Sequence, residues 1–503
     1  NIPQSNFEKI PGSPIAYWVS ETSINIFGKD ATLKKHGTII TGMTTGNNKE
    51  FLKDWTELSF NKLGLNYSDE SNLLKDKNWI PYSKGGDFRK WYGNYNEVVN
   101  WNRKNEFNRS KTTLKNLYFK EGLTWSFITA GKFNARYLPN GFLWDVAGSP
   151  CIFDTKELSF TVLSFTNSIV AQHFLNIYNP TMNYQAVDVG NLPWLISDVT
   201  MPSILTESNI NISKTDWDSR ETSWDFEQSP LLNESSSLSQ AYEQWEEDVT
   251  KDFFQLHTNE EELNRIFIDI YGLQDELTPD VALKDITILQ DELDRNQLEE
   301  DEVELRKQGL GIERKDNGWP VVPEGYRLPI SKEEVISQFI SYAIGVFMGR
   351  YRLDKPGLNI AHPKPSEEEV ASYTYNGHTI EIDEDGIVPL MGDDCNFPDD
   401  AVKRTTELVH AIWGEESLTE NINFIHNALG VNLHRWLTER FWRYHTSGKM
   451  YKKKPIYWLF SSNVNRPQNA AFKVLVYMHR MDRYTLYNIQ RKYLYPHQEY
   501  ISQ

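Results

Sequence analysis

The sequence predicts an α+β fold, in which a mixed, strand-containing domain over residues 1–200 is followed by mainly helical domains. The first observation is composition, because residues 1–200 are rich in aromatic residues, Gly, Asn and Thr. The second is a set of short apolar runs between turn residues, such as LSFTVLSF at 158–165, which are typical of short strands. The third is that later segments carry apolar residues at helical spacing. With 503 residues, we expect more than one core.

A connector and an acidic helical segment follow the first domain. Residues 201–240 are rich in Ser, Thr and Asn, and this composition predicts a connector. Residues 241–310 have apolar residues at helical spacing between Leu263 and Ile270, and Thr278–Pro279 resembles the N-cap and first residue of a further helix. We therefore expect this second segment to be an acidic helical spacer.

Two helical regions complete the chain. Residues 311–400 are predicted to form a mixed helical region, because Ser331 and Glu334 make a capping-box pattern before an apolar stripe. Residues 401–503 are predicted to form a C-terminal helical domain with a basic face. Within that domain, two apolar stripes between 418 and 444 predict a helical hairpin.

The charged residues are distributed unevenly along the chain. The formal net charge is -18, and phosphate binding requires Lys and Arg, so the average disfavours nucleic acid as a partner. However, residues 243–307 contain 21 acidic and 6 basic residues, which accounts for most of the deficit. Residues 77–136 contain 12 basic and 4 acidic residues, and residues 434–483 contain 11 basic and 2 acidic residues. These two basic windows keep nucleic acid as a candidate partner.

The composition also bears on the cellular compartment. Only Cys151 and Cys395 are present, too few for a disulfide scaffold or a four-cysteine zinc site. The chain begins without a signal-peptide pattern and has no apolar run of 18 residues. We expect a cytoplasmic protein without a membrane partner.

The motifs of catalysis and cofactor binding do not occur in recognisable form. Asn179–Met182 is the nearest segment to the Asn-Pro-Pro-aromatic loop of an amino-group methyltransferase, but it lacks the second Pro and the aromatic residue. Gly309–Gly311 follows a charged helix rather than a strand. Asp280 and Glu313–Lys315 loosely match a nuclease metal site, which we interpret as a coincidence in an acidic segment. We expect no catalytic, metal-binding or cofactor-binding residue in this chain.

The segment WIPYSKGGDFRKWYGN at residues 79–94 is the strongest candidate for DNA contact. Its cations suit phosphates, its glycines allow close backbone approach, and its aromatic and amide groups suit stacking and base readout. The candidate residues are Lys84, Arg89, Lys90, Trp91, Tyr92 and Asn94. The alternative is an ordinary glycine turn with a solvated charged face and buried aromatic rings.

Further candidates lie in four other segments. In GMTTGNNKEFLKDW at 42–55, hydroxyls and backbone N–H groups suit a phosphate, although a simple hairpin turn explains the pattern equally well. The basic stretch near the C-terminus also fits the solvation of a helix end. The additional candidates are Thr44, Thr45, Asn47, Lys120, Trp125, Lys132, Arg136, Asn183, Lys452 and Lys453.

Several segments together resemble the C-terminal portion of the adenine-specific DNA methyltransferases of bacteriophage-exclusion (BREX) systems, the PglX type. The matching stretches are IPGSPIAYWVSE, TGMTTGNNKEFLKDW, WIPYSKGGDFRKWYGN, YFKEGLTWSFITAGKFNARYLPNG, NPTMNYQAVDVGNLP, SRETSWDF, SYAIGVFMGRYRLDKPG and KKKPIYWLFSS. They follow one order over almost the whole chain. Two departures are Asn47–Asn48, where Gly-Asp-Asn-type variants are expected, and the end at YISQ, where relatives often continue.

The resemblance implies that residues 1–200 are a DNA target-recognition domain. It also implies that a preceding methyltransferase domain uses S-adenosylmethionine to methylate the N6 amino group of adenine, which marks host DNA in phage defence. This chain alone is then expected to bind double-stranded DNA and to be inactive. Its expected partners are that DNA, its own N-terminal methyltransferase domain and other BREX subunits.

Two alternative functions stay open. The specificity region of a type IIG restriction-modification enzyme shares some of the earlier stretches. A scaffold that docks other defence subunits through the acidic segment and the helical hairpin would also account for the composition. Carbohydrate binding is suggested by the 16 Trp residues, but sugar platforms do not require the basic clustering at 77–136.

Overall fold

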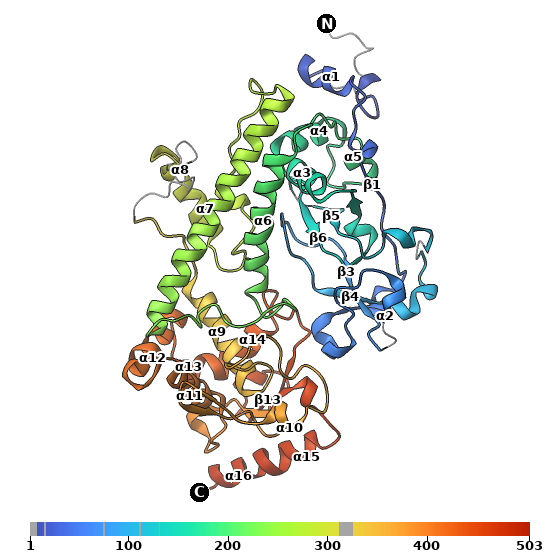
Figure 1. Ribbon diagram of the computed structural model, residues 1–503. Coiled ribbons are helices and arrows are strands. Elements are labelled where there is room, and N and C mark those ends of the chain that lie inside the picture. The colour runs from blue at the N-terminus through green and yellow to red at the C-terminus, as the bar shows by residue number, and fades with distance from the viewer. Residues whose placement is uncertain (1–7, 15–16, 74–75, 110–111, 130, 311–324) are drawn as a thin grey trace.

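The chain forms two lobes that are joined by long helices (Figure 1). The computed structural model describes residues 8–14, 17–73, 76–109, 112–129, 131–310 and 325–503. The first lobe holds two four-stranded sheets, and the second lobe is mainly helical with one three-stranded and one two-stranded sheet. This architecture confirms the predicted α+β fold class.

The first lobe is built on two four-stranded sheets. One has the order β1–β8–β5–β6 with antiparallel pairs, and the other has the order β2–β4–β3–β7 with β3 and β7 parallel. The strands are β1 (Thr38–Ile39), β2 (Leu52–Asp54), β3 (Trp79–Ser83), β4 (Glu97–Asn100), β5 (Gly122–Trp125), β6 (Ala135–Leu138), β7 (Leu143–Trp144) and β8 (Pro150–Ile152). Trp125 and Trp144 are fully buried, so these short strands are held by large aromatic side chains.

The apolar run LSFTVLSF is helical, which corrects the predicted strand. It lies in α3 (Lys156–Thr166), which begins at the N-cap Thr155. The eight residues from Ser159 to Thr166 are all buried, so the helix has no polar face and shows no helical period in its sequence. Its hydroxyl groups form hydrogen bonds with the helix backbone; for example, Thr161 Oγ1 donates to the carbonyl oxygen of Glu157.

The predicted connector is wrong for its first half. Residues 200–218 form helix α6 (Thr200–Asp218), which packs against α3 and α7. The polar residues that suggested a connector make the contact between helices, because Asn259 Nδ2 donates to Ser208 Oγ and Asn209 Oδ1 at 3.2 and 2.9 Å. Residues 219–237 then connect α6 to α7 without a regular helix or strand.

Helix α7 (Leu238–Tyr271) belongs to the cores of both lobes. It has 34 residues and ends at Gly272, whose φ is 64°, so it extends over about 50 Å. Its first turns place Leu238 and Tyr242 in the core of the second lobe. Its later turns place Phe253 and Phe267 in the core of the first lobe. The helix is therefore a shared structural element and not only a spacer.

The helix predicted to start at Thr278–Pro279 is absent. Residues 278–282 lack regular structure, and the next α-helix is α8 (Arg295–Lys307), which is capped by Asp294. Side chains of α7 bind this segment instead: Asn264 Nδ2 donates to the Pro279 carbonyl oxygen at 3.0 Å, and Glu261 Oε1 accepts from the Val281 N–H at 3.1 Å. These tertiary bonds explain why the local helix-start signal is not used.

The second lobe confirms the two helical predictions made for it. Helix α9 (Lys332–Phe347) is capped by the Ser331 side chain, which accepts from the Glu334 N–H at 3.3 Å. The predicted hairpin is α12 (Glu415–Leu429) followed by a helical segment over 433–445, with a left-handed turn at Gly430.

Shorter elements complete both lobes. The remaining helices are α1 (Glu21–Phe27), α2 (Asn48–Phe51), α4 (Ile169–Tyr178), α5 (Ala186–Gly190), α10 (Glu367–Val370), α11 (Ala401–Trp413), α13 (Leu433–Arg435), α14 (Phe441–His445), α15 (Thr485–Asn488) and α16 (Tyr495–Ile501). The remaining strands are β9 (Tyr373–Tyr375), β10 (His378–Ile380), β11 (Ile387–Pro389), β12 (Tyr457–Ser461) and β13 (Lys473–Tyr477), with sheet order β11–β13–β12.

Candidate nucleic-acid interface

Arg89 and Lys90, the central cations of the 79–94 segment, are buried inside the first lobe. Arg89 Nη1 lies 3.1 Å from Asp216 Oδ2, and its guanidinium stacks over the Trp217 ring. Lys90 Nζ lies 2.5 Å from Glu260 Oε2 on α7. Only 4% of Arg89 and 5% of Lys90 are exposed, so in this structure both residues neutralise carboxylates of the chain and cannot reach a phosphate.

The aromatic candidates of the same region are also internal. Trp91 Nε1 donates to Glu260 Oε1 at 2.7 Å, and Trp125 Nε1 donates to the Tyr184 carbonyl oxygen at 2.8 Å. Tyr92 is 5% exposed and burial raises its pKa well above the usual range. The alternative for this segment, a glycine turn with a solvated charged face and buried aromatic rings, is correct for the rings but wrong for the charges, because Arg89 and Lys90 are buried.

Arg136 is fully buried and has no carboxylate partner among the described residues. Its Nη1 donates to three neutral oxygens, those of the Arg89 carbonyl, Ser126 Oγ and Asn134 Oδ1. Burial lowers the pKa of Arg136 to about 10. The side chain therefore supports the local fold and is not placed to contact guanine or phosphate.

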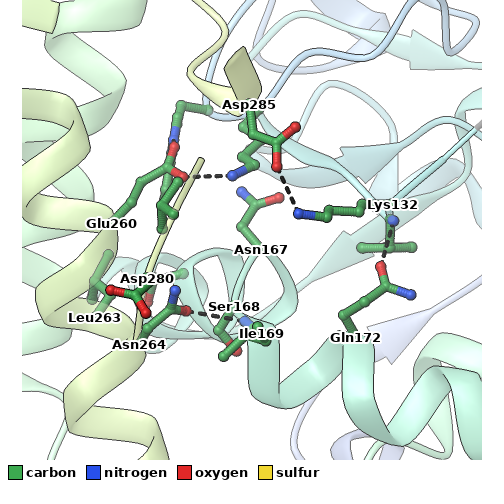
Figure 2. Close-up of a pocket in the computed structure, with 15 residues that line it drawn as sticks. Lys132, Asn167, Ser168, Ile169, Gln172, Glu260, Leu263, Asn264, Asp280 and Asp285 are labelled. Atoms are coloured by element: carbon green, nitrogen blue, oxygen red, sulfur yellow. Dashed lines mark hydrogen bonds and ion pairs between the residues drawn. The ribbon is translucent and has the colours of Figure 1, made fainter. Parts of the chain in front are cut away.

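Lys132 lies at the edge of a pocket between the first lobe and helix α7 (Figure 2). Its Nζ is 2.6 Å from Asp285 Oδ2. The polar groups of the walls serve the backbone: Asn264 Oδ1 accepts from the Ile169 N–H, and Gln172 Oε1 accepts from the Phe133 N–H. The pocket is thus a packing junction whose side chains already have partners.

One group of predicted residues does meet at a surface, which we call the loop surface. It consists of the loops at 42–47, 84–87, 126–128, 146–147 and 181–184. Backbone hydrogen bonds join these loops in a row. The Val146 N–H donates to the Met43 carbonyl oxygen, and the Asp145 N–H donates to the Ser83 carbonyl oxygen. The Phe127 N–H donates to the Ala147 carbonyl oxygen, and the Tyr184 N–H donates to the Phe127 carbonyl oxygen.

The first two loops of this surface carry most of the predicted polar residues. Thr44 is half-buried, Thr45 donates to Asn48 Oδ1 at 2.5 Å, and Asn47 is exposed. Lys84 Nζ lies 3.3 Å from Glu97 Oε2, and both side chains are about one third exposed. Burial raises the pKa of Glu97, and Lys84 opposes that rise.

Asn94 holds the glycine turn of the second loop. Its backbone has a φ of 62°, and its Nδ2 donates to the Asp87 carbonyl oxygen at 2.9 Å. A Cβ built on Gly86 would lie 2.8 Å from the Asn94 side chain, so Gly is required at this turn. Asn94 is thus a turn-forming residue with a half-buried side chain.

The loop that contains Asn183 is fixed by its own hydrogen bonds. Asn179 Nδ2 donates to the Asn183 carbonyl oxygen at 2.8 Å and to Asp188 Oδ2 at 2.9 Å. Thr181 Oγ1 donates to Asn179 Oδ1 at 2.6 Å. Asn183 itself is exposed, so a rigid loop presents its carboxamide to solvent.

Sequence reasoning missed the apolar part of the loop surface. Ile128 is 63% exposed and Met182 is 59% exposed, and their loops are joined by the bond from the Thr129 N–H to the Met182 carbonyl oxygen. It also missed Lys49 and Arg109, which are exposed beside the 42–47 loop. No local pattern marks these residues, because their proximity depends on pairing between distant loops.

The other predicted residues lie apart from the loop surface. Lys120 is exposed and precedes β5. Lys452 and Lys453 are exposed on a turn of the second lobe, with φ of 45° and 66°. Their neighbour Lys454 contacts the first lobe, because its Nζ lies 2.6 Å from Asp54 Oδ2 and 2.9 Å from Glu57 Oε2.

Within the part of the chain that the structure describes, no group of three or more His, Cys, Asp or Glu residues could hold a metal ion. Asp280, one half of the loose nuclease pattern, pairs with Arg306 at 3.3 Å. The other half, Glu313–Lys315, lies outside the described residues. Among the helices that are described, none is both long and apolar enough to cross a membrane.

Comparisons with known proteins identify relatives. No protein-family model matches the chain. Over 524 residues the chain is 36% identical to the adenine-specific methyltransferase PglX of Lacticaseibacillus casei (strain Zhang). Over 518 residues it is 34% identical to the adenine-specific methyltransferase BrxX of Escherichia coli O9:H4 (strain HS). Each match includes 99% of this chain and 39% of the relative, so the chain spans about two fifths of the length of these proteins.

Proposed function

The chain is homologous to the PglX and BrxX adenine-specific methyltransferases and matches their C-terminal portion, and we propose that it is the DNA-binding, sequence-recognition part of such an enzyme. The single observation that carries this proposal is the match over 99% of the chain. S-adenosylmethionine would bind to the remaining portion, which would methylate the N6 amino group of adenine. The biological role would be the marking of host DNA in a bacteriophage-exclusion system.

The loop surface supports the DNA-binding part of the proposal. Loops on a rigid scaffold are common positions for binding residues, and these loops are joined by backbone hydrogen bonds. Carboxamides such as those of Asn47 and Asn183 can pair with adenine in the major groove. The exposed apolar side chains of Ile128 and Met182 suit a thymine methyl group or insertion between base steps.

The cations available for phosphates are fewer than the sequence indicates. Arg89, Lys90 and Arg136 are buried, whereas Lys49 and Arg109 remain exposed beside the loops. With three to five phosphate contacts, raising the salt from 50 to 200 mM should weaken binding on the order of 10²-fold. The sequence alone, with six to ten contacts, predicts a loss of about 10³- to 10⁵-fold.

The test is binding of this chain to a randomised duplex pool, followed by sequencing of the bound fraction. Asn183→Ala should relax the selected sequence at one position and cost about 1–3 kcal/mol against the preferred duplex. Lys49→Ala is the matched control, because it should weaken all duplexes alike and leave the selected sequence unchanged. If wild-type binding has no sequence preference and no salt dependence, the proposal is wrong.

A further inference from the structure

A second hollow opens between the sheets of the first lobe, helices α3 and α6, and the segment after α6. It is separate from the loop surface and from the pocket of Figure 2, since it shares no lining residue with either. Its walls contain five aromatic rings. These are Tyr92, Tyr137, Phe142, Phe160 and Trp224.

The rings are fixed by contacts with one another. Phe142 and Trp224 lie 5.9 Å apart between ring centroids, and Tyr137 meets Phe160 edge to face at 5.6 Å. Tyr137 is also anchored by its hydroxyl, which donates to Glu121 Oε2 at 2.6 Å. Trp224 is half-buried, so part of its surface remains accessible. Tyr92, Phe142 and Phe160 are at most 5% exposed, and the ammonium groups of Lys214 and Lys156 lie 5.3 and 5.0 Å from the centroids of the Tyr92 and Phe160 rings. The accessible aromatic surface of the hollow is therefore that of the half-buried Tyr137 and Trp224.

The rim is polar but has balanced charge. Lys156 Nζ lies 2.6 Å from Glu207 Oε1, and Lys214 Nζ lies 3.7 Å from Asp225 Oδ2, so each cation at the rim has an acidic neighbour. Exposed amides of Asn66, Asn140 and Asn211 supply both donors and acceptors. A neutral planar ring with hydrogen-bonding edges matches this combination better than an anion or an aliphatic chain does.

We propose that this hollow binds a nucleobase, stacked on Trp224 and hydrogen-bonded by the rim amides. Lys156, whose side chain is 50% exposed, stands at the mouth where the phosphate of the same nucleotide would lie. The base has two possible sources, a free mononucleotide or a nucleotide unstacked from DNA. Only the second source rests on the proposed function.

The experiment uses 2-aminopurine, whose fluorescence falls when it stacks on aromatic rings, in two forms. One arm titrates the chain with the free 2-aminopurine monophosphate, and the other with a duplex that carries 2-aminopurine opposite a mismatch. We expect saturable quenching in at least one arm, and the arm that responds identifies the source. Trp224→Ala should weaken that binding about ten-fold or more.

Matched variants separate this site from general effects. Asn211→Ala, at an exposed position of α6, should weaken binding several-fold without affecting the fold. Ile204→Ala, on the same helix but outside the hollow, and Trp458→Ala, in the second lobe, should bind as wild type does. Thermal unfolding of each variant verifies that it is folded.

Three results would overturn the proposal. The first is the absence of quenching in both arms. The second is equal quenching with wild type and with the Trp224→Ala and Asn211→Ala variants. The third is displacement of the probe by maltoheptaose but not by adenosine monophosphate. Failure of the proposed function is distinguishable, because it would abolish duplex binding in every variant while leaving the mononucleotide arm intact.

Discussion

The two basic windows of the sequence differ in how deeply their central cations are buried in the fold. In the first window, at 77–136, Arg89 and Lys90 are buried against Asp216 and Glu260. In the second window, at 434–483, Lys452 and Lys453 are exposed. The windows have similar net charge, yet these two cations of the first window are buried in the first lobe, whereas these two of the second window face solvent.

The difference follows from which elements pack on each window. Helix α7 and the segment after it belong to the acidic block at 243–307, and they cover the first window. Lys90 and Lys132 pair with Glu260 and Asp285 of that block. Two cations of the first window are therefore neutralised by the acidic block, and a charge count identifies a binding surface only where no such partner exists.

The largest effect is expected from breaking the buried pair. Glu260→Gln removes the charge that faces Lys90 and weakens the acceptor of the Trp91 N–H, and loss of one partner of a buried pair costs about 3–5 kcal/mol. Urea unfolding should show this loss. The double variant Lys90→Met with Glu260→Leu should recover most of it, because neither side leaves an unpaired charge. Unchanged stability with lost DNA affinity would show instead that Lys90 faces DNA.

A smaller, pH-dependent effect is expected beside Arg480, a cation of the second window. Arg480 donates to the backbone carbonyl oxygens of Asp383 and Glu384. Burial, with the nearby Asp385 and Asp399 carboxylates, raises the pKa of Asp383 to about 7. The folded state thus holds a proton that the unfolded chain loses near pH 3.8, so this group lowers stability as pH rises from about 4 to 7.

Asp383→Asn should remove that dependence. The stability of the variant relative to wild type should increase between pH 5 and pH 8, by at most about 3 kcal/mol. Urea titrations at both pH values measure the difference. Glu384→Gln is the control, because the carboxylate of Glu384 is next to Asp383 in the chain but is exposed, and it should show no such change. A difference independent of pH would contradict the raised pKa.

The smallest effect on stability is expected in the second window. Lys452→Gln and Lys453→Gln change exposed side chains, so the free energy of unfolding should stay within about 0.5 kcal/mol of wild type. If these side chains contact phosphates, DNA affinity should fall equally for all duplexes, and the salt slope should decrease by about one per contact. Affinity unchanged at every salt concentration would remove this turn from the DNA interface.

Local signals in the sequence were sufficient for some elements. The Ser331 cap and the apolar stripe of α9 lie within one segment, and the hairpin around Gly430 is likewise local. The strand predicted for LSFTVLSF failed because α3 is buried on all sides from Ser159 to Thr166. The connector prediction failed because Asn209 of α6 bonds Asn259 of α7, a contact that composition does not reveal.

The candidate site was less predictable than the fold. Asn47 and Asn183 were identified from turn-rich segments, and the structure places both on exposed loops. Arg89 and Arg136 were misassigned because their partners come from distant segments, as with Asp216 for Arg89. Met182 was overlooked because an exposed apolar residue has no signature in a single sequence.

The sharing of α7 between the two cores limits how recognition can be altered. A cut on either side of this helix would leave Tyr242 or Phe267 without its apolar surroundings, so neither lobe is a unit that can be exchanged whole. The exposed residues of the loops at 42–47 and 181–184, such as Asn47 and Met182, lie outside the cores, whereas Met43 and Tyr184 of the same loops are buried in them. If the chain recognises DNA as proposed, its specificity is therefore expected to change by substitution of exposed loop residues while the two-lobe frame is kept.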